Sequence, residues 1–177
     1  DTSLAEDING KTIAWMKHLA KEKNCAICGS ILFKEIEQYF NRFLFVEPNG
    51  NIQHYNKHHL FSLVEEDKYL TKGNEKILID YKGWKIQPFI CYDIRFPEWV
   101  RTQMAQGAKV LFVVAQWPEP RVQQWEILLK ARAVENQAFV VAVNRVGAGP
   151  DPDDVFSGHS MIIDPLGNVV LQAKEYE

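Results

Sequence analysis

The sequence has little of what marks secreted, membrane or nucleic-acid-binding proteins. It holds three cysteines in 177 residues and no basic run longer than two residues. Its longest apolar stretches, such as residues 110–115, fall far short of the roughly 20 residues that a membrane-spanning helix needs. No signal-peptide pattern opens the chain. We therefore expect no disulfide framework, no membrane partner and no nucleic-acid partner, and a cytoplasmic location.

What is present is the composition of an ordinary globular protein. Hydrophobic residues make up 46% of the chain, charged residues make up 24%, and the formal net charge is −3. One domain of this size can bury roughly 70% of the surface that its unfolded chain exposes, so a core can form without a disulfide or a metal. We expect a single domain over residues 1–177.

Helical and strand-like periodicity alternate along the chain. Residues 10–23 and 121–136 carry apolar side chains at helical spacing, and Pro97 and Gly107 bracket a third helix. Strand-like runs cover residues 25–33, 38–46, 52–56, 76–81, 84–90, 109–115, 138–144, 158–164 and 168–173, with hairpin turns at Asn49-Gly50 and Lys82-Gly83 and a loop over residues 146–156. Hairpins in the first half and strand-helix alternation in the second half predict a layered α/β fold.

Cys91 lies where a strand ends and a helix is about to begin. The positive end of the following helix, and any nearby cation, would favour a thiolate at this position. A small buried hydrophobic residue is the ordinary role of an intracellular cysteine. The position makes Cys91 a candidate nucleophile and leaves both interpretations open.

Three histidines, His54, His58 and His59, stand near the end of a hairpin strand. In an extended segment His58 and His59 point to opposite faces, and no carboxylate or cysteine stands at ligand spacing, so we predict no metal site. Lys57 offers other chemistry, because a lysine beside a reactive thiol can favour the thiolate and donate to a developing oxyanion. A solvated surface charge is the ordinary role of a lone lysine.

Cys25 and Cys28 match the C-x-x-C spacing of redox couples and of half zinc sites. They lie in a predicted strand, where residues i and i+3 face opposite ways, and the sequence has no second pair to complete four ligands. We predict that both pack in the core. The redox alternative predicts a reversible disulfide between them.

Two segments in order resemble the lysine and cysteine motifs of the nitrilase, or carbon-nitrogen hydrolase, superfamily. The first covers residues 55–61 and the second covers residues 83–97. Further likeness to this family is found in residues 116–121, 130–137, 144–147 and 157–160, so that it spans practically the whole chain. The sequence most resembles the bacterial ω-amidase branch, which acts on terminal amides of short oxo-acids.

The resemblance implies a four-layer αββα sandwich, incomplete in this chain, with a cofactor-free Glu-Lys-Cys triad. Matching the motifs gives Cys91 the role of nucleophile and Lys57 that of the cation beside it. Glu66 matches a second, supporting glutamate, with Glu65 as the alternative. Tyr92 would contribute its backbone N–H to the oxyanion site.

The general-base glutamate of the family belongs to a strand-end motif upstream of the helix that opens this chain. The contexts of Glu6, Glu22, Glu35 and Glu37 do not match that motif. We therefore expect the chain to be a piece of a longer protein that continues at both ends. An inactive remnant is the alternative.

Other residues are candidates for contacts with substrate. Trp117 and Phe61 are predicted walls of the pocket, although a core role is the default for each. Arg145 is the candidate cation for a substrate carboxylate, with a structural role as the alternative. Arg132 lies on an apolar helical stripe and is predicted to be a paired structural charge.

The resemblance implies an amidase with a small-molecule substrate, the terminal amide of a short oxo-acid or dicarboxylic acid monoamide. Hydrolysis would proceed through a thioester on Cys91 and release ammonia. Tyr92 and Asp93 after the cysteine favour an amide over a nitrile as substrate, because nitrilases usually have tryptophan and glutamate there. Relatives commonly pair as homodimers. A non-catalytic scaffold that keeps the sandwich is the alternative function.

Overall fold

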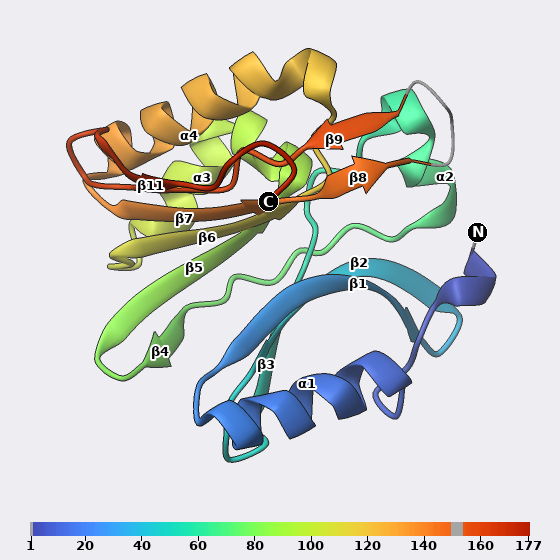
Figure 1. The fold of residues 1–177 in the computed structure, drawn as a ribbon. Coiled ribbons are helices and arrows are strands. Elements are labelled where there is room, and N and C mark those ends of the chain that lie inside the picture. Colours follow the sequence, from blue (N-terminus) through green and yellow to red (C-terminus); the bar gives the residue numbers. More distant parts are fainter. Residues whose placement is uncertain (1, 150–153) are drawn as a thin grey trace. The chain divides into compact units, whose positions relative to one another are not determined.

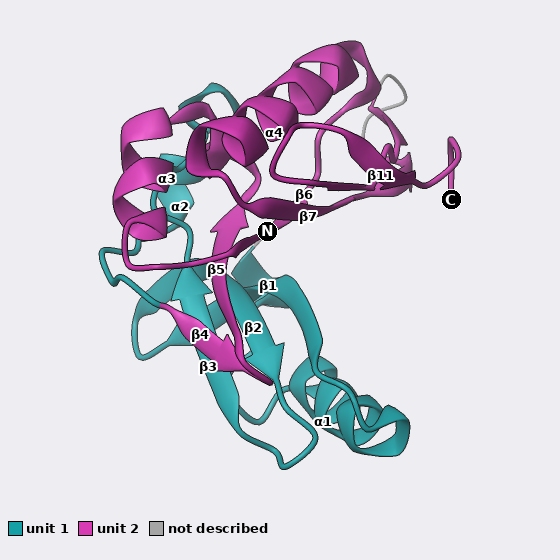
Figure 2. Cartoon of the chain, turned by 90° about the vertical axis from the view of Figure 1, so that its left-hand side faces the viewer, with its two compact units in different colours: residues 1–77 teal, residues 78–177 magenta. Residues whose placement is uncertain are grey.

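The computed structural model describes residues 2–149 and 154–177, and the chain divides into two compact units, residues 1–77 and residues 78–177 (Figure 2). Each unit contains a sheet and helices, which confirms the predicted α/β class. A single domain over residues 1–177 stays a prediction.

The first unit is a three-stranded antiparallel sheet with one long helix on it (Figure 1). The strands are β1 (Ile27–Glu35), β2 (Gln38–Val46) and β3 (Ile52–Asn56), and the helix is α1 (Lys11–Lys23). One face of α1 buries Ile13, Met16 and Ala20 against sheet residues that include Phe33 and Leu44. The predicted helix and the second and third strands are confirmed, while β1 begins and ends two residues later than predicted.

Both ends of α1 are fixed by local chemistry. The carboxylate of Glu6 accepts hydrogen bonds from the backbone N–H of Thr12 at 2.9 Å and from its hydroxyl at 2.7 Å, and so satisfies a helix-start donor. A Cβ atom on Gly10 would lie 2.2 Å from that carboxylate, so this close approach requires glycine. The helix ends at Asn24, whose φ of 50° is left-handed.

The first unit also contains three short helical segments. They are η1 (Thr2–Leu4) near the amino-terminal end, and η2 (Ser62–Val64) and α2 (Glu66–Tyr69) after β3.

The second unit has a six-stranded sheet in the order β11-β10-β7-β6-β5-β4, in which β5, β6 and β7 are parallel. Helices α3 (Pro97–Met104) and α4 (Val122–Asn136) connect these three strands, and Figure 1 shows α4 lying along the sheet. The core joins Val100 and Trp125 of the helices to Leu111 and Val140 of the strands. The strands are β4 (Ile79–Tyr81), β5 (Trp84–Ile90), β6 (Val110–Ala115), β7 (Phe139–Asn144), β10 (Met161–Ile163) and β11 (Val169–Gln172).

Short elements fill the connections of the second unit. They are η3 (Cys91–Arg95), η4 (Glu119–Arg121) and a two-stranded sheet of β8 (Val146–Ala148) and β9 (Val155–Ser157). None of the helices in the described parts of the chain is long and apolar enough to cross a membrane.

Three predicted segments after residue 75 differ most from the structure. The predicted loop over residues 146–156 is wrong in part, because β8 and most of β9 lie within it; its residues 150–153 lie outside the described residues. The strand predicted from residue 158 begins only at Met161, because Gly158 and His159 have left-handed φ angles of 85° and 58°. The strand predicted from residue 76 begins at Ile79.

Candidate active site

Lys57 is a buried lysine held by one carboxylate. Its side chain is 4% exposed, and its Nζ donates to Oε2 of Glu66 at 2.5 Å. A buried ammonium group is stable only when a counter-charge and hydrogen bonds replace its lost hydration. The solvated surface charge that we considered for Lys57 is therefore wrong.

Glu66 is fixed by three donors from different parts of the first unit. Its Oε2 atom also accepts from the backbone N–H of Phe61 at 2.8 Å, and its Oε1 atom accepts from Nδ2 of Asn41 at 3.3 Å. Glu65 instead pairs with Lys68 at 2.5 Å, where both side chains are more than half exposed. Of the two glutamates left open by the sequence, Glu66 is the one that contacts Lys57.

The backbone at Lys57 is held from both sides. Its N–H donates to the carbonyl oxygen of Asn41 at 2.9 Å, and its own carbonyl oxygen accepts from the N–H of Gly73 at 2.9 Å. A Cβ atom at Gly73 would lie 2.3 Å from the carbonyl oxygen of Asn56. The segment around Gly73 can approach this closely only because it has no side chain there.

The histidines beside Lys57 do not lie in a strand. β3 ends at Asn56, and the rings of His58 and His59 pack edge to face with centroids 4.6 Å apart, so the expectation of opposite faces is wrong. Nδ1 of His58 lies 2.6 Å from the carbonyl oxygen of Gly73. Desolvation, and then the nearby charge of Arg42, lower the pKa of His54. Within residues 2–149 and 154–177, no three His, Cys, Asp or Glu side chains are placed to hold a metal ion.

Cys91 occupies a strained backbone conformation at the end of β5. Its φ of 47° lies in the left-handed region, which costs a residue with a side chain roughly 1 kcal/mol or more, and such strain is concentrated at functional sites. The residue is partly buried and packs against the core of the second unit. Cys91 therefore packs against the core and keeps some exposed surface, so the nucleophile and the packing role both stay predictions.

Buried charges hold the turn that follows Cys91. The carboxylate of Asp93, which has no exposed surface, accepts from the backbone N–H of Ile90 at 3.1 Å. Nε of Arg132 donates to the carbonyl oxygen of Ile94 at 2.8 Å, and its NH1 pairs with Glu135 at 2.8 Å. This confirms Arg132 as a paired structural charge. The turn after Cys91 is thus held by Asp93 at its start and by Arg132 at Ile94.

Three candidate residues of the second unit follow neighbouring parallel strands. Cys91 comes directly after β5, Trp117 comes two residues after β6, and Arg145 comes directly after β7. Ligands of α/β sheets bind outside the carboxyl ends of such strands. The sheet topology therefore brings these residues to the same edge of the sheet, at the carboxyl ends of β5, β6 and β7.

The contacts of Trp117 and Arg145 are those of structural residues. The Trp117 residue is 4% exposed, its ring lies 5.7 Å from that of Trp125, and its Nε1 donates to the carbonyl oxygen of Arg121 at 2.6 Å. The guanidinium of Arg145 donates to Oε1 of Gln116 at 3.0 Å and to the carbonyl oxygen of Ala148 at 2.5 Å. The substrate-contacting roles of Trp117 and Arg145 stay predictions.

Two further features surround Cys91. The ring of Tyr92 packs edge to face on Phe96 with centroids 5.1 Å apart, and the backbone N–H of Tyr92 lies in the first turn of η3. Arg95 is exposed, and its guanidinium lies 5.0 Å from the centre of the Trp117 ring. Arg95 was not among the residues predicted for the site, although it lies four residues after Cys91 in the same motif.

The predicted core packing of Cys25 and Cys28 is wrong, because both residues are exposed and free. Cys25 precedes β1. Ile27 packs toward α1, and because neighbouring residues of a strand face opposite sides, the adjacent Cys28 faces away from that helix. Although Cys28 has exposed surface, the protein atoms around it desolvate its sulfur and raise the pKa of the thiol to about 11. Such a thiol is not ionised at neutral pH, which disfavours the redox alternative.

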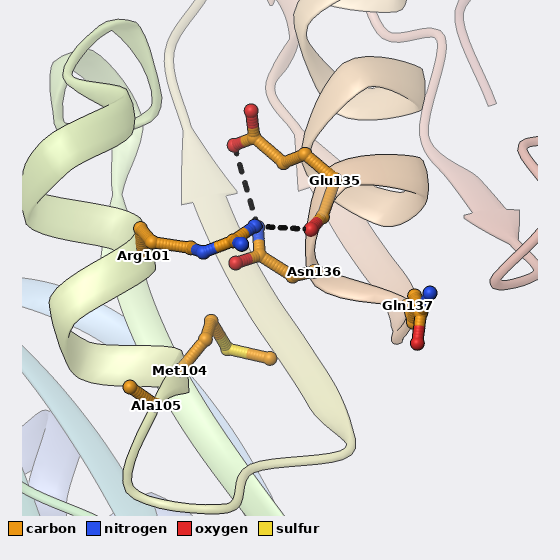
Figure 3. A pocket seen from close by; sticks show the side chains of 6 residues that line it. All are labelled: Arg101, Met104, Ala105, Glu135, Asn136 and Gln137. Carbon is orange, nitrogen blue, oxygen red and sulfur yellow. Dashed lines mark hydrogen bonds between the residues drawn. The ribbon is translucent and has the colours of Figure 1, made fainter.

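A pocket of about 270 Å³ lies elsewhere in the second unit, at the carboxyl ends of α3 and α4 (Figure 3). NH1 of Arg101 donates across it to the carbonyl oxygen of Glu135 at 2.5 Å. Both helices run back to the amino ends of the next strands, so this pocket and Cys91 lie at opposite ends of the parallel strands.

The sequence was compared with known proteins. A family model described as Carbon-nitrogen hydrolase matches residues 1–177. The chain is 42% identical over 176 residues to the 2-oxoglutaramate amidase of Bacillus subtilis (strain 168), covering 98% of this chain and 67% of that protein. It is 38% identical over 176 residues to the Omega-amidase YafV of Escherichia coli (strain K12), covering 99% of this chain and 66% of that protein. The chain thus spans about two thirds of the length of these relatives.

Solved structures show the same likeness. XC1258 from Xanthomonas campestris, a CN-hydrolase superfamily protein, matches with a TM-score of 0.93 and 37% identity, covering 98% of this chain and 68% of that chain. Nit3 of Saccharomyces cerevisiae, a member of branch 10 of the nitrilase superfamily, matches with a TM-score of 0.85 and 26% identity over 96% of this chain and 64% of that chain. The fold is therefore that of nitrilase-superfamily proteins, and the chain belongs to the carbon-nitrogen hydrolase family.

Proposed function

We propose that the protein is a cysteine-dependent amidase that hydrolyses the terminal amide of a short oxo-acid or dicarboxylic acid monoamide. Family membership and relatives named 2-oxoglutaramate amidase and Omega-amidase support this substrate class. The observation that carries the proposal is the left-handed backbone of Cys91 at the carboxyl end of a parallel strand. Strain of this kind is kept where a side chain must be presented for chemistry.

The chemistry requires three contributions, because an amide is a poor electrophile with a poor leaving group. The Cys91 thiol would give its proton to the general base while its sulfur attacks the amide carbon and forms a tetrahedral intermediate. The ammonium of Lys57 and the backbone N–H of Tyr92 would stabilise its oxyanion. Collapse breaks the carbon-nitrogen bond, ammonia leaves with a proton from the general base, and a thioester remains. Water deprotonated by the same base then frees the acid and the thiol.

We propose that the general base is a glutamate other than Glu66. Glu66 is engaged in another way, since it already accepts from Lys57, Phe61 and Asn41. Its proposed role is to hold the Lys57 ammonium in one orientation. An ammonium has three donors and Glu66 accepts one of them, and the proposed mechanism uses another for the oxyanion.

A short acidic substrate needs a cation for its carboxylate, and we assign this role to Arg95 ahead of Arg145. Arg95 is exposed at the same sheet edge as Cys91, whereas Arg145 already donates to Gln116 and Ala148. Arg95→Gln is expected to raise KM for succinamate about tenfold while leaving KM for the uncharged butyramide within about twofold. The same pattern in Arg145→Gln, with none in Arg95→Gln, would assign the carboxylate to Arg145.

The direct test is ammonia release by the full-length protein from 2-oxoglutaramate, succinamate and butyramide, together with labelling of Cys91 by iodoacetamide. The proposal expects fast labelling, and turnover that is fastest with the acidic amides. A non-catalytic scaffold predicts slow labelling at Cys91 and no ammonia, and that result would overturn the proposal.

The proposal includes a cytoplasmic location and a homodimer. It also keeps Phe61 and Trp117 as residues that contact the substrate. The three free cysteines of the chain suit a reducing compartment. A sedimentation measurement that gives a monomer at working concentration would contradict the homodimer.

A further inference from the structure

We propose that Asn41 is a positioning residue that holds the Glu66 carboxylate turned toward Lys57. This inference rests on the proposed amidase function, in which Lys57 stabilises the oxyanion. The geometry that points to it is a double contact, since one residue of β2 holds both partners of the Lys57–Glu66 ion pair.

The two contacts of Asn41 use different parts of the residue. Its backbone carbonyl oxygen accepts from the N–H of Lys57 at 2.9 Å, which fixes where the lysine leaves β3. Its side-chain Nδ2 donates to Oε1 of Glu66 at 3.3 Å. The other carboxylate oxygen, Oε2, serves Lys57 at 2.5 Å and the N–H of Phe61 at 2.8 Å. Asn41 thus fixes the rotation of this carboxylate through its second oxygen.

The neighbouring residue on β2 supports the same segment. Arg42 is buried, and its Nε donates to Oδ1 of Asn56 at 2.7 Å, one residue before Lys57. Its guanidinium also lies 4.0 Å from the ring centre of Phe33. Because packing and hydrogen bonds fix β2 here, the Asn41 side chain is presented from a rigid strand, as a positioning group must be.

The chemistry of an amide group suits this role. Nδ2 of asparagine is a donor, so it can hold a carboxylate oxygen of Glu66 in place by a hydrogen bond. An aspartate at the same place would put two carboxylates together, and the pair would then hold a proton at low pH. That proton would restore a donor to Glu66, so the aspartate variant should regain activity as the pH falls.

The test compares Asn41→Ala and Asn41→Asp with the matched control Asn51→Ala in the full-length protein. Nδ2 of Asn51 also donates to a glutamate, Oε1 of Glu47, at 2.6 Å, but on the exposed hairpin turn. Asn41→Ala is expected to lower kcat about tenfold and to change KM less than about twofold. Asn41→Asp should lose more at pH 8 and approach the alanine variant or exceed it near pH 5. Asn51→Ala should match the wild type.

Two further measurements separate positioning from a merely structural role. In a Glu66→Gln background, Asn41→Ala should cost less than about twofold, because Asn41 acts through Glu66. Amide hydrogen exchange at Phe61, whose N–H bonds to Glu66, should become several-fold faster in Asn41→Ala. If Asn41→Ala folds poorly, Asn41→Ser supplies a small polar replacement for the same measurements.

The outcomes distinguish this inference from the proposed function. Ammonia release by the wild type together with normal kcat and normal Phe61 exchange in Asn41→Ala overturns the role of Asn41 alone. If the losses of kcat in Asn41→Ala and Glu66→Gln are fully additive, the role of Asn41 is also overturned. If the wild type releases no ammonia, the amidase proposal fails. Exchange at Phe61 then decides the positioning of Glu66: faster exchange supports it and unchanged exchange overturns it.

Discussion

Asn144 and Trp117 form a two-way hydrogen-bond pair across the ends of neighbouring strands. Oδ1 of Asn144 accepts from the backbone N–H of Trp117 at 2.7 Å, and Nδ2 donates to the carbonyl oxygen of Trp117 at 2.9 Å. The same Nδ2 donates to the carbonyl oxygen of Gly158 at 2.7 Å. One buried amide therefore holds the chain after β6 and the chain before β10 at the sheet edge that carries Cys91.

Asn144→Asp tests how much this amide matters. The substitution replaces a donor with an oxygen that faces two carbonyl oxygens in a buried site, so we expect the free energy of unfolding to fall by about 3 kcal/mol. Urea unfolding measures the change. The control is Asn49→Asp on an exposed turn, where Oδ1 accepts from the N–H of Asn51 and aspartate can do the same. An equal fall in the free energy of unfolding of both variants would contradict the structural role of the Asn144 amide.

Replacing Cys91 should separate chemistry from backbone strain. Neither Cys91→Ala nor Cys91→Gly is expected to form an acyl-enzyme, which mass spectrometry of the full-length protein with substrate would detect. Glycine adopts the left-handed region without penalty, so Cys91→Gly should be about 1 kcal/mol more stable than Cys91→Ala. A substrate-derived adduct on another residue would refute Cys91 as the nucleophile, and equal stabilities would refute the strain.

Two adjacent glutamates provide a matched pair of variants. Glu66→Gln removes the charge that offsets buried Lys57, so we expect stability to fall by about 2 kcal/mol and kcat to fall about a hundredfold. Glu65→Gln breaks only an exposed pair with Lys68 and should change stability by less than about 0.5 kcal/mol. Thermal unfolding and ammonia release measure the two effects. Equal changes of stability and of kcat in the two variants would contradict the role of Glu66 as the partner of Lys57.

Acid should weaken the ion pair between Glu35 and Arg42. The hydrogen bond from Arg42, at 2.9 Å, lowers the pKa of Glu35 below its ordinary value of 4.5. Because the folded state has the lower pKa, the stabilisation is fully present above pH 4.5 and is lost as the pH falls through the folded value. The Glu35 side chain is 54% exposed, so the effect is at most about 1 kcal/mol. The stability difference between wild type and Glu35→Gln should be constant above about pH 4.5 and shrink as the pH falls below it, and a difference independent of pH would contradict this.

Much of the fold could be predicted because its signals are local. The bounds of β2 and β3 follow from two apolar runs that flank Asn49-Gly50, and Gly50 has the left-handed φ of 87° that such a turn needs. The helix over residues 122–136 follows from a stripe of apolar side chains at helical spacing. These patterns depend on near neighbours in the chain, so sequence reasoning finds them.

What the sequence could not show depends on contacts between distant residues. Whether Glu65 or Glu66 contacts Lys57 depends on the left-handed φ of 59° at Glu65, which turns the chain just before α2. The burial of Lys57 depends on Asn41 and Gly73, which lie 16 residues before it and 16 after it. Exposure of Cys25 and Cys28 depends on which face of β1 meets α1, and alternation alone does not identify that face.

Gly73 has no side chain, yet it determines where Lys57 can lie. Even a methyl group there would press 2.3 Å from the Asn56 carbonyl oxygen and push aside the segment from which Lys57 emerges. In a genetic screen, substitutions of Gly73 should therefore give the same phenotype as substitutions of Lys57. A search confined to reactive side chains would overlook this glycine.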